Sequence, residues 1–170
     1  MADLREIPLT TIDGAETSLG EYADKTVMVV NVASRCGQTP QYETLEHLQK
    51  QYADRGFTVI GIPSNQFLQE LGSEDAIKEF CAVNYGVTFP LMKKTRVNGR
   101  KRHPLYAILT KFKDNQGKAG KVGWNFEKFV ITPSGKVSRF RSGTWPDAPE
   151  VIAAIEAELA PAKAEPTTPV

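Results

Sequence analysis

The chain has 170 residues, of which 41% are hydrophobic and 24% are charged, values typical of one globular domain that buries its own core. Its net charge is only +1, so overall charge does not indicate a nucleic-acid partner, and we expect none. The first residues carry charges, and no segment contains the roughly 18 consecutive apolar residues of a membrane-spanning helix. We therefore expect a cytoplasmic protein.

The first half of the chain contains alternating strand and helix patterns. Residues 26–33 (TVMVVNVA) form a nearly continuous apolar, β-branched run, which is typical of a strand covered on both faces. Residues 42–56 carry apolar side chains at helical spacing and end at Gly56. Residues 57–64 (FTVIGIPS) are a second apolar strand, ended by Pro63. A strand, a helix and a strand in this order predict a crossover that joins two parallel strands.

The second half begins with a helix pattern over residues 73–86, where Ser73 is the expected N-cap and Gly86 the expected end. Residues 87–92 are short and apolar, but Pro90 disfavours a central position in a sheet because proline has no N–H to donate. Further on, the sequence predicts a helix over 103–112, a hairpin over 124–140 with TPSG as its turn, and a last helix over about 147–159.

This order of elements predicts an α/β protein with the thioredoxin fold, in which helices flank a central mixed sheet. We expect residues 1–159 to form one domain. Residues 160–170 are rich in proline, alanine and threonine, a composition that predicts a disordered tail.

Cys36 lies just after the first predicted strand, in the stretch NVASRCGQTP. Reactive groups gather at the carboxyl ends of parallel strands, and the N-terminus of the following helix favours a thiolate. A structural thiol remains the alternative at this point. No second cysteine follows at C-x-x-C spacing, which excludes dithiol exchange between adjacent cysteines. The two cysteines and two histidines lack the spacing of zinc ligands, so we expect neither metal nor cofactor.

Three stretches carry a resemblance to a known family. NVASRCG, IPSNQF (62–67) and WNFEKFVI (124–131) resemble the signature motifs of glutathione peroxidases, in a version with cysteine in place of selenocysteine. FCAVNYGVTFPLMKK (80–94) is similar to the fungal and bacterial branch that uses two cysteines and is reduced by thioredoxin. The resemblance runs from about Ile7 to Leu159. It implies a thiol peroxidase that acts on hydrogen peroxide and on organic or lipid hydroperoxides.

The family surrounds its reactive sulfur with a tryptophan, an asparagine and a glutamine, which stabilise the thiolate and the leaving oxygen. Trp124 and Asn125 match the first two, although the residue types alone would favour a core tryptophan beside a turn asparagine. The stretch NQFLQELG is one residue shorter than the family pattern, with Leu71 in place of the usual proline. We assign the glutamine role to Gln69 because the Gln-Glu pair is retained, with Gln66 as the second candidate.

Cys81 lies on the predicted helix 73–86, four residues after Ile77, a spacing that suits a core position. The resemblance instead implies that Cys81 is a resolving cysteine. It would condense with the sulfenic acid of Cys36 into an intramolecular disulfide, which thioredoxin would reduce. The short segment 113–123 resembles the monomeric members of the family, so we expect a monomer.

Basic residues are concentrated in one stretch. From Lys93 to Lys121 there are ten basic residues and one acid, Asp114, which gives a local charge of +9. The stretch suits a solvated basic face, or a surface for transient contact with an anionic membrane or an acidic partner. A second function also fits the two cysteines: a peroxide sensor that passes oxidation to the thiols of a partner protein.

Overall fold

The structure of the chain is a computed structural model that describes residues 3–161. A four-stranded sheet forms its centre, in the order β4 (Phe57–Pro63), β3 (Thr26–Val32), β5 (Lys128–Ile131) and β6 (Val137–Phe140). The β3 and β4 strands are parallel, whereas β3–β5 and β5–β6 are antiparallel. This is the mixed sheet that the sequence predicts. The predicted tail lies outside the described residues from residue 162 onward.

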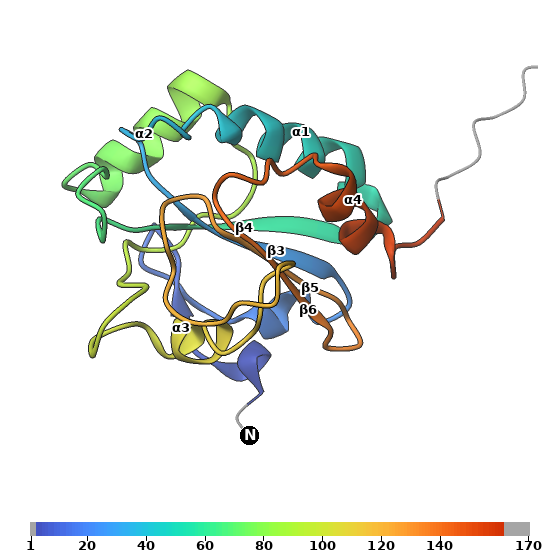
Figure 1. The fold of residues 1–170 in the computed structure, drawn as a ribbon. Helices are drawn as coiled ribbons and strands as arrows, with labels where there is room; N and C mark the ends of the chain where they lie inside the picture. The colour runs from blue at the N-terminus through green and yellow to red at the C-terminus, as the bar shows by residue number, and fades with distance from the viewer. Residues whose placement is uncertain (1–2, 162–170) are drawn as a thin grey trace, which may run out of the picture.

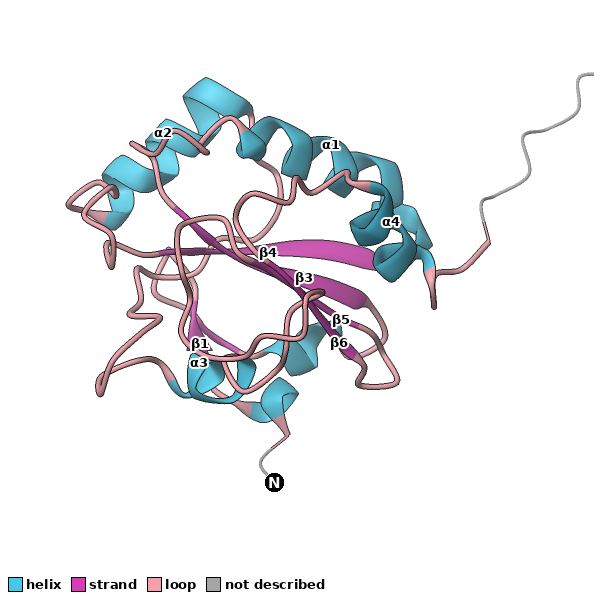
Figure 2. Cartoon of the chain, viewed as in Figure 1, coloured by secondary structure: helices cyan, strands magenta, loops and turns pink. Residues whose placement is uncertain are grey.

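Helices cover both faces of the sheet, as Figures 1 and 2 show. On one face lie α1 (Gln41–Tyr52), α2 (Glu74–Tyr85) and α4 (Pro149–Glu156), and on the other lies α3 (Pro104–Leu109) with the N-terminal segment. The remaining elements are η1 (Leu4–Glu6), β1 (Leu9–Thr10), β2 (Glu16–Thr17), η2 (Leu19–Tyr22) and η3 (Ala53–Arg55). None of the helices within residues 3–161 has the length and apolar character needed to cross a membrane.

The position of β3 explains why residues 26–33 are almost all apolar instead of alternating between polar and apolar. All seven of its residues are buried, because helices cover both of its faces. Met28 and Val30 pack with the α1 side, whereas Val27 and Val29 pack with the α3 side. One strand therefore contributes to two hydrophobic clusters, and among its buried residues only Thr26, at its start, and Asn31, near its end, are polar.

The helix boundaries follow the predicted signals. The Ser73 hydroxyl accepts a hydrogen bond from the N–H of Ala76 at the start of α2. Gly86 ends that helix in the left-handed conformation, with φ of 57°, and Gly56 does the same after η3, with φ of 87°. The segment around Pro90 forms only isolated bridges at the edge beside β4, as a proline in a strand requires.

The hairpin and the short N-terminal strands differ from the sequence-based expectation. The hairpin was expected from residue 124, but β5 begins at Lys128 because residues 124–127 form a turn that bonds to Asn31. The β1–β2 hairpin has two residues in each strand, too few for an alternating pattern to reveal it. Both differences lie in backbone that is shaped by distant contacts.

Candidate active site

Cys36 lies in the loop between β3 and α1, at the carboxyl edge of the parallel strands. The Thr39 hydroxyl organises this loop: it accepts from the N–H of Cys36 and donates to the carbonyl of Ala33, both at 2.9 Å. Cys36 is a free thiol and only 7% exposed. The loop therefore holds the sulfur in a fixed position just below the surface.

Two N–H groups point at the sulfur. The indole Nε1 of Trp124 lies 3.2 Å from the Cys36 Sγ, and the main-chain nitrogen of Gln38 lies 3.3 Å from it. Both groups donate, so they stabilise negative charge on the sulfur. Trp124 comes from a segment 88 residues away in the sequence, and it is 39% exposed. The sulfur thus receives one donor from its own loop and one from the opposite wall of the site.

Gln69 and Asn125 are joined to each other. The Asn125 Nδ2 donates to the Gln69 Oε1 at 3.0 Å, and the Gln69 carbonyl accepts from the N–H of Arg35, next to Cys36, at 2.9 Å. Asn125 is buried, and its Oδ1 has no partner among the described residues. The second candidate glutamine, Gln66, points elsewhere, since its Oε1 accepts from the N–H of Asn98. The structure therefore brings together Cys36, Trp124, Asn125 and Gln69.

The turn that carries Trp124 and Asn125 is fixed by Asn31. The Asn31 Nδ2 donates to the carbonyl of Trp124 at 3.1 Å, and its Oδ1 accepts from the N–H of Glu127 at 3.0 Å. Between these contacts Phe126 adopts a φ of 62°, a conformation that is uncommon for a residue with a side chain. Asn31 thereby specifies the position of both site residues without touching the sulfur.

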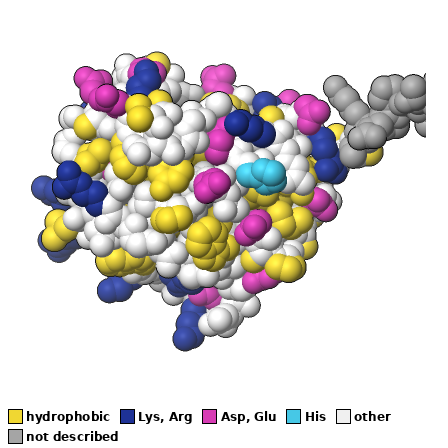
Figure 3. Space-filling model, turned by 90° about the horizontal axis from the view of Figure 1, so that it is seen from above, with side chains coloured by type: hydrophobic (Ala, Val, Ile, Leu, Met, Phe, Trp, Pro, Cys, Tyr) yellow, Lys and Arg dark blue, Asp and Glu magenta, His cyan; other side chains and the backbone are white. Residues whose placement is uncertain are grey.

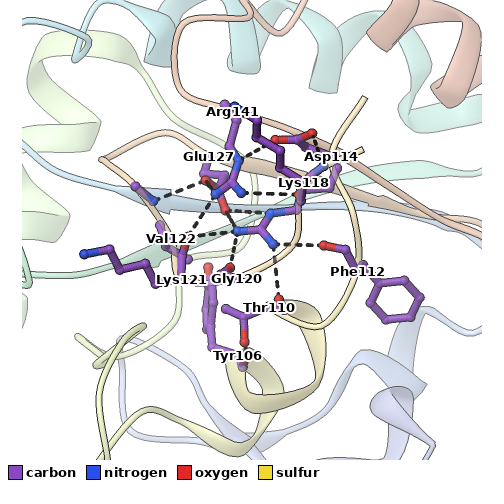
Figure 4. Close-up of polar contacts among 12 residues, drawn as sticks. Tyr106, Thr110, Phe112, Asp114, Lys118, Gly120, Lys121, Val122, Glu127 and Arg141 are labelled. Atoms are coloured by element: carbon purple, nitrogen blue, oxygen red, sulfur yellow. Dashed lines mark hydrogen bonds and ion pairs between the residues drawn. The ribbon is translucent and has the colours of Figure 1, made fainter. Parts of the chain in front are cut away.

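A buried ion-pair network supports the same turn from below (Figure 4). The Glu127 Oε2 accepts from Arg139 at 2.7 and 3.0 Å, and its Oε1 accepts from Arg141 at 2.8 Å. Arg141 also binds Asp114, which lowers the pKa of that carboxyl to about 2. Arg139 donates its remaining N–H groups to the carbonyls of Thr110, Phe112, Gly120 and Lys121. Every charge in the network has several partners, which a buried ion pair requires.

The loop that carries Gln69 is held to the Cys36 loop by Glu70. The Glu70 Oε1 accepts from the N–H of Ser34 at 3.1 Å and from that of Leu71 at 2.8 Å. Burial raises the pKa of Glu70, and these two hydrogen bonds oppose the rise. Sequence reasoning did not select Asn31, Gln38 or Glu70. A signal existed for Asn31, because a polar residue inside an apolar strand needs internal partners.

Two apolar residues, Phe67 and Leu68, directly precede Gln69 in the chain. Phe67 packs on Trp124 with ring centroids 5.0 Å apart, and Leu68 is 85% exposed with a φ of 60°. A leucine that is so exposed and strained is held there by the loop rather than by its own packing.

Cys81 lies on α2, 1% exposed, in the same hydrophobic cluster as Cys36. Burial raises the pKa of its thiol to about 11, so the thiol stays protonated near neutral pH. Both cysteines are free thiols, and Cys81 shares its hydrophobic cluster with Tyr42 of α1. The structure thus places Cys81 in the core rather than in contact with the donors around Cys36.

The glutathione peroxidase family model matches residues 4–110 of the chain, more than half of its length. The Thioredoxin/glutathione peroxidase BtuE of Escherichia coli is 44% identical over 170 residues, covering 88% of this chain and 93% of the relative. The Hydroperoxy fatty acid reductase gpx1 of Synechocystis is 45% identical over 152 residues, covering 85% and 89%. The crystal structure of T. cruzi GPX1 is 31% identical with a TM-score of 0.70, covering 89% of this chain and 92% of that one.

Proposed function

The chain belongs to the glutathione peroxidase family, and from this premise we propose how it works as a thiol peroxidase on hydroperoxides. Cys36 is the attacking group. Its thiolate takes one oxygen of the O–O bond, becomes a sulfenic acid, and the other oxygen leaves as an alcohol or water once it gains a proton. The 3.2 Å contact between the Trp124 indole and the Cys36 sulfur is the observation that carries this assignment.

Trp124, Asn125 and Gln69 serve the same step. The indole N–H stabilises the thiolate before attack, and we assign stabilisation of the leaving oxygen to the amides of Asn125 and Gln69, a role that their contact with each other beside the Trp124 turn supports. The donors are held in place by Asn31 and Glu70, so they need little rearrangement as charge moves from sulfur to oxygen.

Cys81 resolves the sulfenic acid. Its thiol attacks the Cys36 sulfur, a disulfide forms, and the hydroxyl of the sulfenic acid leaves as water with the thiol proton. A disulfide requires the two Cα atoms to lie within about 7 Å, so α2 has to unwind locally to bring Cys81 to the loop. Only Ile77 and Cys81 of α2 are buried, so the free energy needed to unwind this helix locally is small.

Thioredoxin is the proposed reductant. An exposed thiolate of thioredoxin would attack one sulfur of the intramolecular disulfide and regenerate both thiols through a mixed disulfide. The name of the Escherichia coli relative supports this reductant, although it includes glutathione as well. The name of the Synechocystis relative supports fatty acid hydroperoxides as substrates beside hydrogen peroxide.

We further propose that residues 1–159 act as one monomeric domain in the cytoplasm, where a thioredoxin system keeps both cysteines reduced. Transient contact with an anionic membrane through Lys93, Lys94 and Arg96 would bring the site to lipid hydroperoxides. Charge reversal at these three residues is expected to slow reduction of a hydroperoxide in anionic vesicles and to leave reduction of free hydrogen peroxide unchanged. Equal rates on vesicles would remove the proposed contact.

The mechanism is tested by peroxide-dependent NADPH oxidation with thioredoxin and thioredoxin reductase, comparing the wild type with Cys36→Ser and Cys81→Ser. We expect both variants to be inactive, and glutathione with glutathione reductase to replace thioredoxin poorly. Full turnover of Cys81→Ser would leave a one-cysteine mechanism. Slow turnover with accumulating mixed disulfides to another protein would instead favour the sensor.

A further inference from the structure

A hollow lined by basic side chains lies apart from the cysteine site. It has a volume of about 340 Å³ and lies between β1 and the loop that follows Met92, which is the yellow-green segment leading into α3 in Figure 1. Leu9 and Met92 form its apolar floor, and both are buried. Five of its lining side chains are cationic: Lys93, Lys94, Arg96, Lys101 and Arg102.

The charges in this basic hollow are not compensated by the protein. No aspartate or glutamate lines it. The Lys94 Nζ binds the carbonyls of Leu71 and Gly72, but within residues 3–161 no carboxylate pairs with any of the other four cations. Elsewhere in the chain Arg139 and Arg141 each have acidic partners. Like charges that converge on a concave surface repel one another until an anion joins them.

The backbone of the hollow is held in shape before any ligand arrives. The N–H of Lys93 donates to the carbonyl of Thr10 at 2.8 Å, which joins the loop to β1. The N–H of His103 donates to the carbonyl of Arg96 at 2.9 Å and closes the loop on itself. The His103 Nδ1 accepts from the N–H of Leu105 and fixes the ring at the start of α3. A preformed wall reduces the ordering that ligand binding requires.

We propose that the basic hollow binds a small, multiply charged anion through its phosphate groups. Arginine and lysine donors match phosphate oxygens, and four uncompensated cations call for more charge than one carboxylate brings. At about 30 Å³ per water molecule, the hollow has room for roughly eleven waters, which is enough for a diphosphate or a phosphorylated headgroup. None of the residues around Cys36 lines it, so this site is separate from the residues that carry the peroxide chemistry, although Lys93, Lys94 and Arg96 also belong to the proposed membrane contact.

Inorganic pyrophosphate is the probe, titrated into the reduced full-length chain at low ionic strength by calorimetry. We expect saturable binding to the wild type and about ten-fold weaker binding to Lys101→Ala/Arg102→Ala. The matched control is Lys113→Ala/Lys118→Ala, which removes the same charge from exposed residues of the same basic stretch outside the hollow. Thermal unfolding of each variant verifies the fold.

If the control variant bound pyrophosphate as weakly as the hollow variant does, the proposed site would be overturned, because overall charge alone would then explain the binding. An absence of saturable binding to the wild type would overturn it as well.

A second experiment identifies the source of the phosphate, with phosphatidylcholine vesicles that contain or lack phosphatidic acid. Binding to phosphatidic acid that pyrophosphate displaces supports a lipid headgroup, whereas binding of pyrophosphate without vesicle binding supports a soluble phosphate compound. Peroxidase turnover enters neither arm, so failure here is distinguishable from failure of the proposed mechanism.

Discussion

Two regions of the site are attached to the fold in different ways: the turn with Trp124 and Asn125, and the helix α2 with Cys81. The turn bonds to Asn31 inside β3 and rests on the fully buried pair of Glu127 and Arg139. The attachment of α2 depends on weaker contacts: the exposed ion pair of Lys78 with Asp13, the Ser73 cap, and only two buried side chains.

The difference follows the chemistry expected of each region. Donors that stabilise charge on sulfur act best when they are already in position. A resolving cysteine has to travel from the core to the loop, so its helix has to open. Together with α1 and α4, the helix α2 forms the outer layer on that side of the molecule, where Figure 3 shows charged side chains of both signs interspersed with hydrophobic ones. Variants that weaken the contacts of the turn or those of the helix test the difference between the rigid turn and the releasable helix.

The largest effect is expected from breaking the buried network. Glu127→Ala would leave Arg139 and Arg141 without their shared carboxylate, and a broken buried pair costs about 3–5 kcal/mol of unfolding free energy. Asp13→Ala breaks the exposed ion pair with Lys78 of α2, and we expect it to change the unfolding free energy by no more than the error of the measurement. Urea unfolding of both variants makes the comparison, and equal losses would contradict it.

The next effect concerns the pH dependence of stability. The Lys128 Nζ of β5 is buried against Gln41 and the Ser142 carbonyl, and burial lowers its pKa from 10.5 to about 7. Between these values the unfolded chain binds the proton more tightly than the folded one, so this group makes stability rise from about pH 7 to pH 10.

Lys128→Met removes that titration. We expect the variant to gain stability relative to the wild type at pH 6, by about 1–3 kcal/mol, and to lose the advantage by pH 10. Urea unfolding at the two pH values measures the change. A difference between variant and wild type that is the same at both pH values would show that Lys128 does not titrate in this range.

An effect of similar size is expected at the sulfur itself. Trp124→Phe keeps a ring against Phe67 but removes the N–H, and a hydrogen bond to a charged group is worth about 1.5–3 kcal/mol. The rate constant for reaction of reduced enzyme with hydrogen peroxide should fall about 10- to 100-fold, followed by stopped-flow fluorescence or by competition with a peroxide probe. The control is Trp145→Phe, which changes the other exposed tryptophan. Equal rates for Trp124→Phe and the wild type would remove the indole from the mechanism.

The smallest effect comes from loosening α2. Ser73→Ala removes its N-cap, at a cost of about 1 kcal/mol, which corresponds to a roughly five-fold larger population of opened helix. Amide hydrogen exchange over residues 74–85 should accelerate by that factor, with β5 unchanged. Ser18→Ala removes the cap of η2 and serves as the matched control. If unwinding limits disulfide formation, the same variant forms the disulfide faster, and slower formation would contradict the role of unwinding.

Most of the fold is specified by local signals. Continuous apolar runs define β3 and β4, and a serine and a glycine define the ends of α2. The donors around the sulfur depend on contacts between distant segments, so no local pattern predicts their geometry. The turn at 124–127 takes its shape from Asn31, 93 residues before Trp124. Likewise, the sequence offers two glutamines, Gln69 and Gln66, and only the folded chain shows that Gln69 contacts Asn125 whereas Gln66 contacts Asn98.

Buried charges are the least predictable part. Glu127, Lys128 and Arg139 lie on or beside strands where the alternation of polar and apolar residues suggests solvent. They are buried because loops from residues 110–121 and 142 cover them and supply carbonyl partners. A single sequence does not specify which loop covers which strand, so these residues are identified only in the folded chain.

In the proposed mechanism, Cys36 is oxidised first and Cys81 resolves it. Intact mass after one equivalent of hydrogen peroxide tests this most directly. The wild type is predicted to lose about 2 Da as the disulfide forms, and Cys81→Ser to gain about 16 Da as the sulfenic acid persists. Cys36→Ser is predicted to keep its mass. A gain of about 16 Da in the wild type, or oxidation of Cys36→Ser at the same rate, would contradict the claim.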